Sequence, residues 1–319
     1  MKPPETTVAA EPTPERFSNP LLRHVAATRP AFLSVTLIGC LIGLASAHAD
    51  GVALRPLTAL ATILIALVAH AGGNVINDYH DAVSGADASN VGRIFPFTGG
   101  SRFIQNGVMT PRQTALFGYG LLALVIPGGL WLAAMSGWGL ILIGIAGLLL
   151  GWAYSAPPLH LVARGLGEVV VAACWLLVVV GADYVQRGEF GWTPVAGGFS
   201  FALLVANLLY INQFPDHDSD AAAGKRTVVV RLGPETAKWG YFGIAVAAYA
   251  WVIVQIGREN LPQVCAAAAI TLLMSVTAAR QLREHASEPA ELEAAIKLTI
   301  GAAVLHGFIM AAMLAFNWR

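Results

Sequence analysis

The sequence predicts an all-α, polytopic membrane protein, on the strength of its composition and the spacing of its apolar runs. Of its 319 residues, 56% are hydrophobic and only 12% are charged. A soluble domain typically carries about 25% charged residues. Apolar runs recur from residue 31 to residue 317, and about 20 apolar residues suffice for a helix to cross a bilayer. A large soluble all-α protein is disfavoured, because so few polar residues cannot cover its surface.

Nine transmembrane helices account for these runs. We expect them at 31–48, 57–76, 113–134, 138–156, 166–185, 192–213, 237–256, 260–279 and 298–317. With this count, 15 of the 19 basic residues lie on the N-terminal side, and only Arg55, Arg187, Arg258 and Arg319 lie on the other. Lysine and arginine concentrate in cytoplasmic loops. The chain is therefore predicted to sit in the cytoplasmic (inner) membrane with its N-terminus and long loops in the cytoplasm.

The chain divides into a short tail and one membrane domain. Residues 1–20 are rich in Pro, Glu and Thr, which is typical of a disordered cytoplasmic tail. Residues 21–319 are predicted to form a single domain. Cys40, Cys174 and Cys265 all fall inside predicted spans without close spacing, which indicates apolar packing rather than a disulfide or zinc framework.

An acidic cluster closes the second span. The stretch "NVINDYHD" places Asn74 four residues before Asp78, with Asn77 and Asp81 beside them. Side chains three and four residues apart share a helix face, so these four are predicted to point the same way. A single acidic cluster of this kind is usually a solvated loop.

A second cluster closes the sixth span on the same side of the membrane. The stretch "NQFPDHDSD" presents Asn212, Asp216 and Asp220 with the same spacing, although Pro215 can distort that turn. The repeat suggests two related halves, with coincidence as the alternative. Two matched clusters of hard oxygen donors favour Mg²⁺ over zinc.

Mg²⁺ held by few carboxylates typically also binds phosphate oxygens, and anion-binding groups follow both clusters. Lys225 and Arg226 come after the second cluster beside Gly224. After the first cluster, "FTGGSR" offers glycine backbone amides and Arg102. Basic residues in cytoplasmic loops are the ordinary alternative. No GxxxxGK[ST] motif is present, so a nucleotide-binding P-loop is not indicated. These residues predict a site for Mg²⁺ and a diphosphate whose apolar tail lies among the helices.

Four motifs carry a family resemblance. "NDYHDAVSGAD", "FTGGSR", "YSAPPLHLVARGLGE" and "FPDHDSDAAAGKRTVVVRLG" resemble the UbiA superfamily of intramembrane prenyltransferases. They are most similar to its 1,4-dihydroxy-2-naphthoate polyprenyltransferases of menaquinone synthesis. The resemblance runs from Arg29 to Gly233. It implies nine helices around a central cavity with a cytoplasmic cap. Gly85 stands where the commonest first motif has an aspartate, with Asp87 two residues on, which leaves the metal role of Asp87 open.

The resemblance also implies roles for particular residues. The catalytic, Mg²⁺-holding carboxylates would be Asp78, Asp81, Asp216 and Asp220. Diphosphate would be bound by Asn74, Asn77, Arg102, Lys225, Arg226, Tyr154 and Arg164. Arg29, near the start of the first span, would meet the carboxylate of the aromatic acceptor, with simple snorkelling to the interface as the alternative. The implied reaction is attack of an electron-rich ring carbon on the allylic cation that forms as diphosphate leaves. With a hydroxynaphthoate acceptor, CO₂ is lost at the prenylated carbon.

Two other interpretations stay open at the level of sequence. The first keeps the chemistry and changes the acceptor to 4-hydroxybenzoate or another aromatic acid. The second is a cation transporter, which nine spans and a weak internal repeat also fit. In such transporters the ion site usually lies near mid-membrane, whereas these aspartates gather at one end.

Overall fold

The computed structural model describes residues 10–316, and within them every regular element is helical. The long helices are α2 (Pro30–Ala49), α3 (Pro56–Ser84), α5 (Pro111–Ser136), α6 (Gly139–Ser155), α7 (Gly167–Arg187), α8 (Thr193–Asn212), α11 (Pro234–Gly257), α12 (Leu272–His285) and α13 (Glu293–Ala315). The shorter ones are α1 (Pro20–Ala27), α4 (Ala86–Ser89), η1 (Leu161–Arg164), α9 (His217–Ala222), α10 (Val228–Leu232), η2 (Gln263–Thr271) and η3 (Pro289–Leu292).

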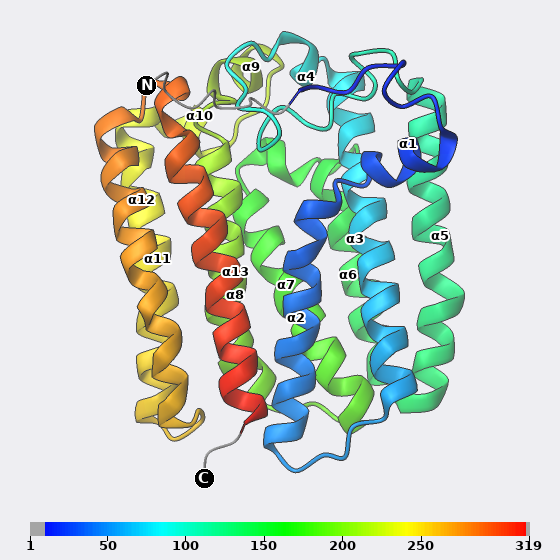
Figure 1. Cartoon of the computed structure of the whole chain (residues 1–319), viewed down its shortest axis with the longest axis vertical. Coiled ribbons are helices and arrows are strands. Elements are labelled where there is room, and N and C mark those ends of the chain that lie inside the picture. The colour runs from blue at the N-terminus through cyan, green and yellow to red at the C-terminus, as the bar shows by residue number, and fades with distance from the viewer. Residues whose placement is uncertain (1–9, 317–319) are drawn as a thin grey trace, which may run out of the picture.

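The predicted all-α membrane architecture is confirmed. In the described part of the chain, eight helical segments are long and apolar enough to cross a membrane. The remaining predicted span, 138–156, is α6, which has 17 residues and is shorter than the others. The helices run side by side, and their connections at one end form a cap that contains α1, α4, α9 and α10 (Figure 1).

Local sequence sets many of the helix boundaries. Proline occupies the first turn of α2, α3, α5, α8 and α11, where its missing N–H costs no hydrogen bond. Thr110 and Gln113 form a reciprocal capping box at the start of α5. Gly85, at φ +82°, ends α3 in the left-handed conformation that glycine adopts without strain.

Three predicted boundaries differ from the structure. The span expected at 57–76 continues as α3 to Ser84, so the first acidic cluster lies on the helix itself. The second cluster was expected on one helix face, but α8 ends at Asn212 and Pro215 separates it from α9. Pro215 cannot continue the α8 hydrogen-bond ladder because it has no N–H. The span expected at 260–279 begins as the 3₁₀ helix η2 before α12.

Part of the predicted tail lies outside the described residues, which begin at Ala10. From there the segment runs over the cap (Figure 1). Glu11 pairs with Arg93 at 2.6 Å and accepts a hydrogen bond from Asn106 at 3.0 Å. Residues 10–19 therefore contact the cap loops.

The core is built by close helix packing. Helix α7 packs between α2 and α8, α13 packs on α2 and α8, and α11 packs on α8. Gly43 of α2 allows the close approach of α7. A Cβ at this position would collide with the Val179 carbonyl oxygen and lie 2.8 Å from the Ala182 Cβ. Small residues at helix interfaces allow such close approach in membranes.

A polar network closes the end of the bundle opposite the cap. Arg187 pairs with buried Asp183 at 2.8 Å and with Asp50 at 2.6 Å. Arg55 donates to the backbone carbonyls of Val185 and of Met135, the latter at 3.0 Å. Because these charges are paired and hydrogen-bonded, the network joins α2, α5 and α7 without leaving an isolated buried charge.

We expect Gly43→Ala to lower the stability of the detergent-solubilised protein by about 1–3 kcal/mol, because the added methyl overpacks the α2–α7 contact. Gly243→Ala is the matched control, since Gly243 lies in α11 and a Cβ there meets nothing within 4 Å. Thermal unfolding followed by size-exclusion chromatography measures both. Equal melting temperatures for the two variants would contradict the packing argument.

Candidate active site

The two acidic clusters meet in the cap around one lysine. The Lys225 ammonium lies 2.7 Å from Asp81 at the end of α3 and 3.4 Å from Asp220 in α9. Lys225, Asp81 and Asp220 are each at least nine-tenths buried. The cation therefore joins carboxylates from both halves of the sequence. The repeated Asn–Asp spacing led us to expect the two clusters in one site, but not this bridge.

The loop between α4 and α5 wraps the first cluster. The Ser101 backbone N–H donates to Asp78 Oδ1 at 3.2 Å. Gly100 has φ +71°, and a Cβ there would lie 2.5 Å from Asp87 Oδ2 and 3.1 Å from Asp78 Oδ1. Only glycine allows the backbone to pass this close to both carboxylates, which is the structural reason for "TGG" in this loop.

The same loop region also holds the second cluster. The Asn90 amide donates to Asp216 Oδ1 at 2.6 Å, and Thr98 and the Gly99 backbone also hydrogen-bond to Asp216. The sequence marked neither Asn90 nor Thr98 as a site residue. Thr98 belongs to "FTGGSR", in which only the glycines and Arg102 were predicted to bind the ligand, and the only signal for Asn90 was its position between the first cluster and the glycine pair.

Burial changes the acid–base behaviour of these groups. It raises the pKa of Asp220 to about 6, although Lys225 opposes the shift. Burial, together with the charges of Asp81 and Asp78, raises the pKa of Asp87 to about 8. Burial disfavours the charged form of Lys225, but Asp81 and Asp220 outweigh it and hold the pKa of that ammonium above its usual value. Carboxylates crowded in this way favour a bound cation.

The donor set suits a hard divalent cation. Among residues 10–316, no group of three or more His, Cys, Asp or Glu side chains is arranged to hold a metal by itself. Carboxylates from both clusters nevertheless line one cavity with Asn90 and Asn212, whose Oδ1 atoms are buried and lack a hydrogen-bond partner in the described structure. Carboxylate and amide oxygens are ligands of the kind that Mg²⁺ binds. The residues present therefore fit that ion.

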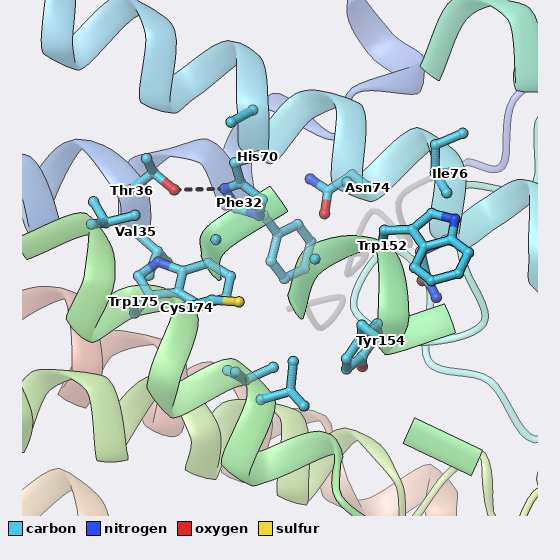
Figure 2. A pocket seen from close by; sticks show the side chains of 18 of the residues that line it. Phe32, Val35, Thr36, His70, Asn74, Ile76, Trp152, Tyr154, Cys174 and Trp175 are labelled. Carbon is cyan, nitrogen blue, oxygen red and sulfur yellow. Dashed lines mark hydrogen bonds between the residues drawn. The ribbon is translucent and has the colours of Figure 1, made fainter. Parts of the chain in front are cut away.

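A large cavity runs from this site down between the helices. Its volume is about 550 Å³. Within the described chain it is lined by α2, α3, α5, α6, α7 and α8, while α11, α12 and α13 pack behind α8 and α2. Its walls are aromatic and aliphatic, with Phe32, Tyr154 and Trp175 facing the space in Figure 2. The lining reaches Val185 next to the far-end polar network.

Most of the predicted site residues line this cavity. They are Arg29, Asn74, Asn77, Asp81, Tyr154, Asp216, Asp220 and Lys225. Asp78 lies directly behind them, buried against Ser101. The Asn74 amide donates to the Thr28 carbonyl at 3.0 Å and so ties α3 to the segment that carries Arg29. Gln213 also lines the cavity and hydrogen-bonds to Glu168; no sequence motif had marked it.

Three predicted diphosphate ligands do not line the cavity in this structure. Arg102 donates to the Asp87 backbone carbonyl and lies 3.9 Å from Glu11. Arg164 is exposed and donates to the Pro158 carbonyl at 2.8 Å, and Arg226 is exposed beside it. Backbone carbonyls and Glu11 are the partners of Arg102 and Arg164 here, so proximity in sequence to the acidic clusters did not place these side chains in the cavity.

Comparison with known proteins agrees with this geometry. The profile of the UbiA prenyltransferase family matches residues 36–316. The chain belongs to the UbiA prenyltransferase family. As a prenyltransferase of this family it is a multi-pass membrane enzyme, and the cation-transporter alternative loses its support.

Proteins with named activities share modest sequence identity with this chain. The 1,4-dihydroxy-2-naphthoate octaprenyltransferase of Bacillus subtilis is 28% identical over 231 residues, covering 71% of each chain. The corresponding protein of Mycobacterium tuberculosis is 29% identical over 191 residues, or 60% of this chain and 63% of that one. The 2-carboxy-1,4-naphthoquinone phytyltransferase of Synechocystis is 24% identical over 307 residues, covering 92% of each.

Solved structures share the fold. A UbiA homolog from Archaeoglobus fulgidus bound to DMAPP and Mg²⁺ superposes with a TM-score of 0.62 at 18% identity, over 91% of this chain and 99% of that one. A UbiA homolog from Aeropyrum pernix gives 0.66 at 17% identity, over 87% and 97%. Both likenesses support the fold of this UbiA-family enzyme.

Lys225→Met should lower the melting temperature markedly at pH 8, because removing one partner of a buried ion pair costs about 3–5 kcal/mol. The loss should shrink as the pH falls from 8 toward 6. Burial raises the pKa of Asp220 to about 6 even though Lys225 opposes the shift, so in the variant this pKa lies higher still, and the uncompensated carboxylate becomes neutral as the pH falls toward 6. Arg226→Met, one residue along and exposed, is the control. Unaltered melting of Lys225→Met at pH 8 would refute the bridging role.

Proposed function

We propose that this enzyme transfers a polyprenyl group from a prenyl diphosphate to 1,4-dihydroxy-2-naphthoate, in menaquinone biosynthesis. The observation that carries the proposal is the position of both acidic clusters and Lys225 at the head of a deep apolar cavity. An anionic head and a long apolar tail on one molecule match that arrangement. The naphthoate acceptor is suggested by the named activities of the relatives.

The diphosphate head belongs in the cap. Asp78, Asp81, Asp216 and Asp220 would hold Mg²⁺, with the amide oxygens of Asn90 and Asn212 beside them. When bound, Mg²⁺ would supply Lewis-acid stabilisation of the charge that develops on the departing diphosphate. Lys225, which lines the cavity, would contribute a positive charge to the same oxygens. Asn74, Asn77 and Tyr154 would complete the polar wall of the site.

The cavity below the cap would serve the prenyl chain and protect the reaction. Its aliphatic and aromatic lining favours an isoprenoid tail by burial of apolar surface. The same lining excludes water from the allylic carbon once its bond to diphosphate weakens. A cation formed there reacts with the acceptor instead of being hydrolysed.

The acceptor supplies the electron pair for the new carbon–carbon bond and loses its carboxylate as CO₂. A ring carbon donates its electron pair to the first prenyl carbon, and the bond from that carbon to diphosphate oxygen breaks. The electron pair of the ring–carboxylate bond then restores aromaticity as CO₂ departs. Arg29, whose guanidinium lies over the Phe32 ring at 4.5 Å and lines the cavity, would hold the carboxylate before the reaction.

A single-ring acceptor is the second candidate. A 4-hydroxybenzoate prenyltransferase would use the same head site and the same tail cavity. The aromatic and polar lining near Phe32 and Arg29 fits an aromatic acid of either size.

The placement of the enzyme in the membrane is part of the proposal. The strong excess of basic residues on the N-terminal side supports a cytoplasmic cap in the cytoplasmic (inner) membrane. Soluble polar substrates would then reach the head site from the cytoplasm, and the prenyl chain would come from the bilayer.

Asp78→Ala and Asp216→Ala should each reduce prenyl transfer by about 100-fold or more, because each removes a carboxylate that would hold Mg²⁺, the ion whose positive charge would stabilise the departing diphosphate. Asp218→Ala is the control, since Asp218 belongs to the same motif but is exposed. Turnover by detergent-purified variants measures the effect, with expression and elution profile as checks on folding. Near-normal rates in either of the first two variants would contradict the metal assignment.

The acceptor is tested by supplying geranylgeranyl diphosphate with either 1,4-dihydroxy-2-naphthoate or 4-hydroxybenzoate. We expect prenylated naphthol and released CO₂ with the first acid, in the presence of Mg²⁺ and not in excess chelator. Product formed only from hydroxybenzoate would keep the site and replace the acceptor. Full activity in chelator would remove Mg²⁺ from the proposal.

A further inference from the structure

A polar and aromatic patch lies on the cavity wall below the acidic clusters. It consists of Phe32 and Thr36 of α2, His70 of α3, and Cys174 and Trp175 of α7, and we call it the His70 patch (Figure 2). Phe32, His70 and Trp175 contribute rings, Thr36 a hydroxyl and Cys174 a thiol, and all five line the cavity. His70 belongs to none of the motifs that mark the site in the sequence.

The His70 ring is held in a defined orientation. The Thr36 hydroxyl lies 2.8 Å from Nδ1, and the ring meets the Trp175 indole edge-on, with centroids 5.0 Å apart and planes at 89°. Thr36 engages Nδ1, and the Asn74 side chain one turn along α3 also hydrogen-bonds to the ring, so a molecule in the cavity would meet the ring at Nε2, beside the Asn74 amide. A ligand hydroxyl can pair with Nε2 in either tautomer, since a hydroxyl both donates and accepts.

A second histidine in the membrane-spanning region shows the contrast. His306 of α13 is fully buried, and Ser200 lies 2.9 Å from its Nε2 while the Ala268 carbonyl lies 3.2 Å from its Nδ1. Protein groups thus engage both of its nitrogens, and it does not line the cavity. His306 is explained by packing alone. An ionisable side chain that faces a cavity inside a membrane protein is more often functional.

The depth of the patch matches the reacting end of the substrates. His70, Asn74 and Asp78 follow one another at four-residue intervals along α3, so His70 lies about 12 Å below Asp78 along the helix axis. Arg29 is close enough to interact electrostatically with both His70 and Asp78. A two-ring aromatic acid with its carboxylate at Arg29 would extend from the head site toward the patch.

The aromatic members of the patch supply walls for such a ring. Phe32 lies beneath the Arg29 guanidinium, and Trp175 faces the same space from α7 (Figure 2). The Trp175 Nε1 atom is buried and has no hydrogen-bond partner among the described residues. Offset or edge-on aromatic contacts with these rings would orient an aromatic ligand beyond simple burial.

We propose that His70 is a positioning and specificity residue for the acceptor, whose C4 hydroxyl hydrogen-bonds to Nε2 while its rings pack against Phe32 and Trp175. The inference rests on the proposed function and adds to it the selection of an acid that carries this second hydroxyl. A one-ring acid held at Arg29 lacks the second ring that would pack against Phe32 and Trp175. Recognition of the second hydroxyl thus belongs to a side chain that the acidic motifs do not contain.

The first test compares His70→Phe with wild type in steady-state kinetics. We expect the KM for 1,4-dihydroxy-2-naphthoate to rise about tenfold, as for loss of one buried hydrogen bond, with the KM for prenyl diphosphate unchanged. His70→Gln, whose amide can replace Nε2, should recover part of the loss. Equal rises in both KM values, or none, would overturn the assignment.

The second test removes the partner group from the ligand. Equilibrium binding without prenyl diphosphate compares 1,4-dihydroxy-2-naphthoate with 1-hydroxy-2-naphthoate, which lacks the C4 hydroxyl. Wild type should bind the dihydroxy acid about tenfold more tightly, and His70→Phe should bind the two acids equally. Preference retained in the variant would refute the hydrogen bond.

A third measurement does not depend on any His70 variant folding. Cys174 lies in the patch, whereas Cys40 and Cys265 are buried outside the cavity. We expect 1,4-dihydroxy-2-naphthoate to slow alkylation of wild-type Cys174 by N-ethylmaleimide, with Cys174→Ala as the control for labelling. Acceptor turnover without protection would overturn the patch assignment and leave the proposed function standing. Wild-type protein that prenylates no aromatic acid would overturn both.

Discussion

The contact of Lys225 with Asp81 and Asp220 is the interaction on which the rest of the site depends. Buried carboxylates are costly unless a cation compensates them, and here one ammonium serves an aspartate from each half of the sequence. This contact fixes α9 against the end of α3. The loop that carries Asn90 and Gly100 then closes over both clusters, with its amides directed at Asp216 and Asp78.

The cavity continues this arrangement as a gradient of polarity. Charges lie at the cap, the aromatic and polar side chains of the His70 patch lie below them, and aliphatic residues line the remainder. At the far end, the Arg187 and Arg55 network joins α2, α5 and α7. A molecule with an anionic head and an apolar tail has only one favourable orientation in such a cavity, because reversal would bury its charges in an apolar environment.

The arginines of the cap support its loops in this structure. Arg102, Arg164 and Arg231 donate to backbone carbonyls of the cap loops, and Glu11 pairs with Arg93. Irregular loops leave many carbonyls without partners from secondary structure, and guanidinium groups with several donors satisfy them. The arginines therefore stabilise the loops that enclose the acidic clusters, while Lys225 is the basic residue in contact with both.

Hydropathy and helical spacing are local properties, and they determined the nine apolar helices and the two Asn–Asp clusters. The shared face of Asn74, Asn77 and Asp81 follows from their place on α3, and all three line the cavity. Tertiary structure alone decided that Lys225 bridges the halves, that Asn90, Thr98 and Gln213 join the site, and that three arginines do not. It also brought His70, Thr36 and Trp175 together from three helices. The physical reason is that each polar side chain has several possible partners along the chain, and only the packing of helices and loops selects among them.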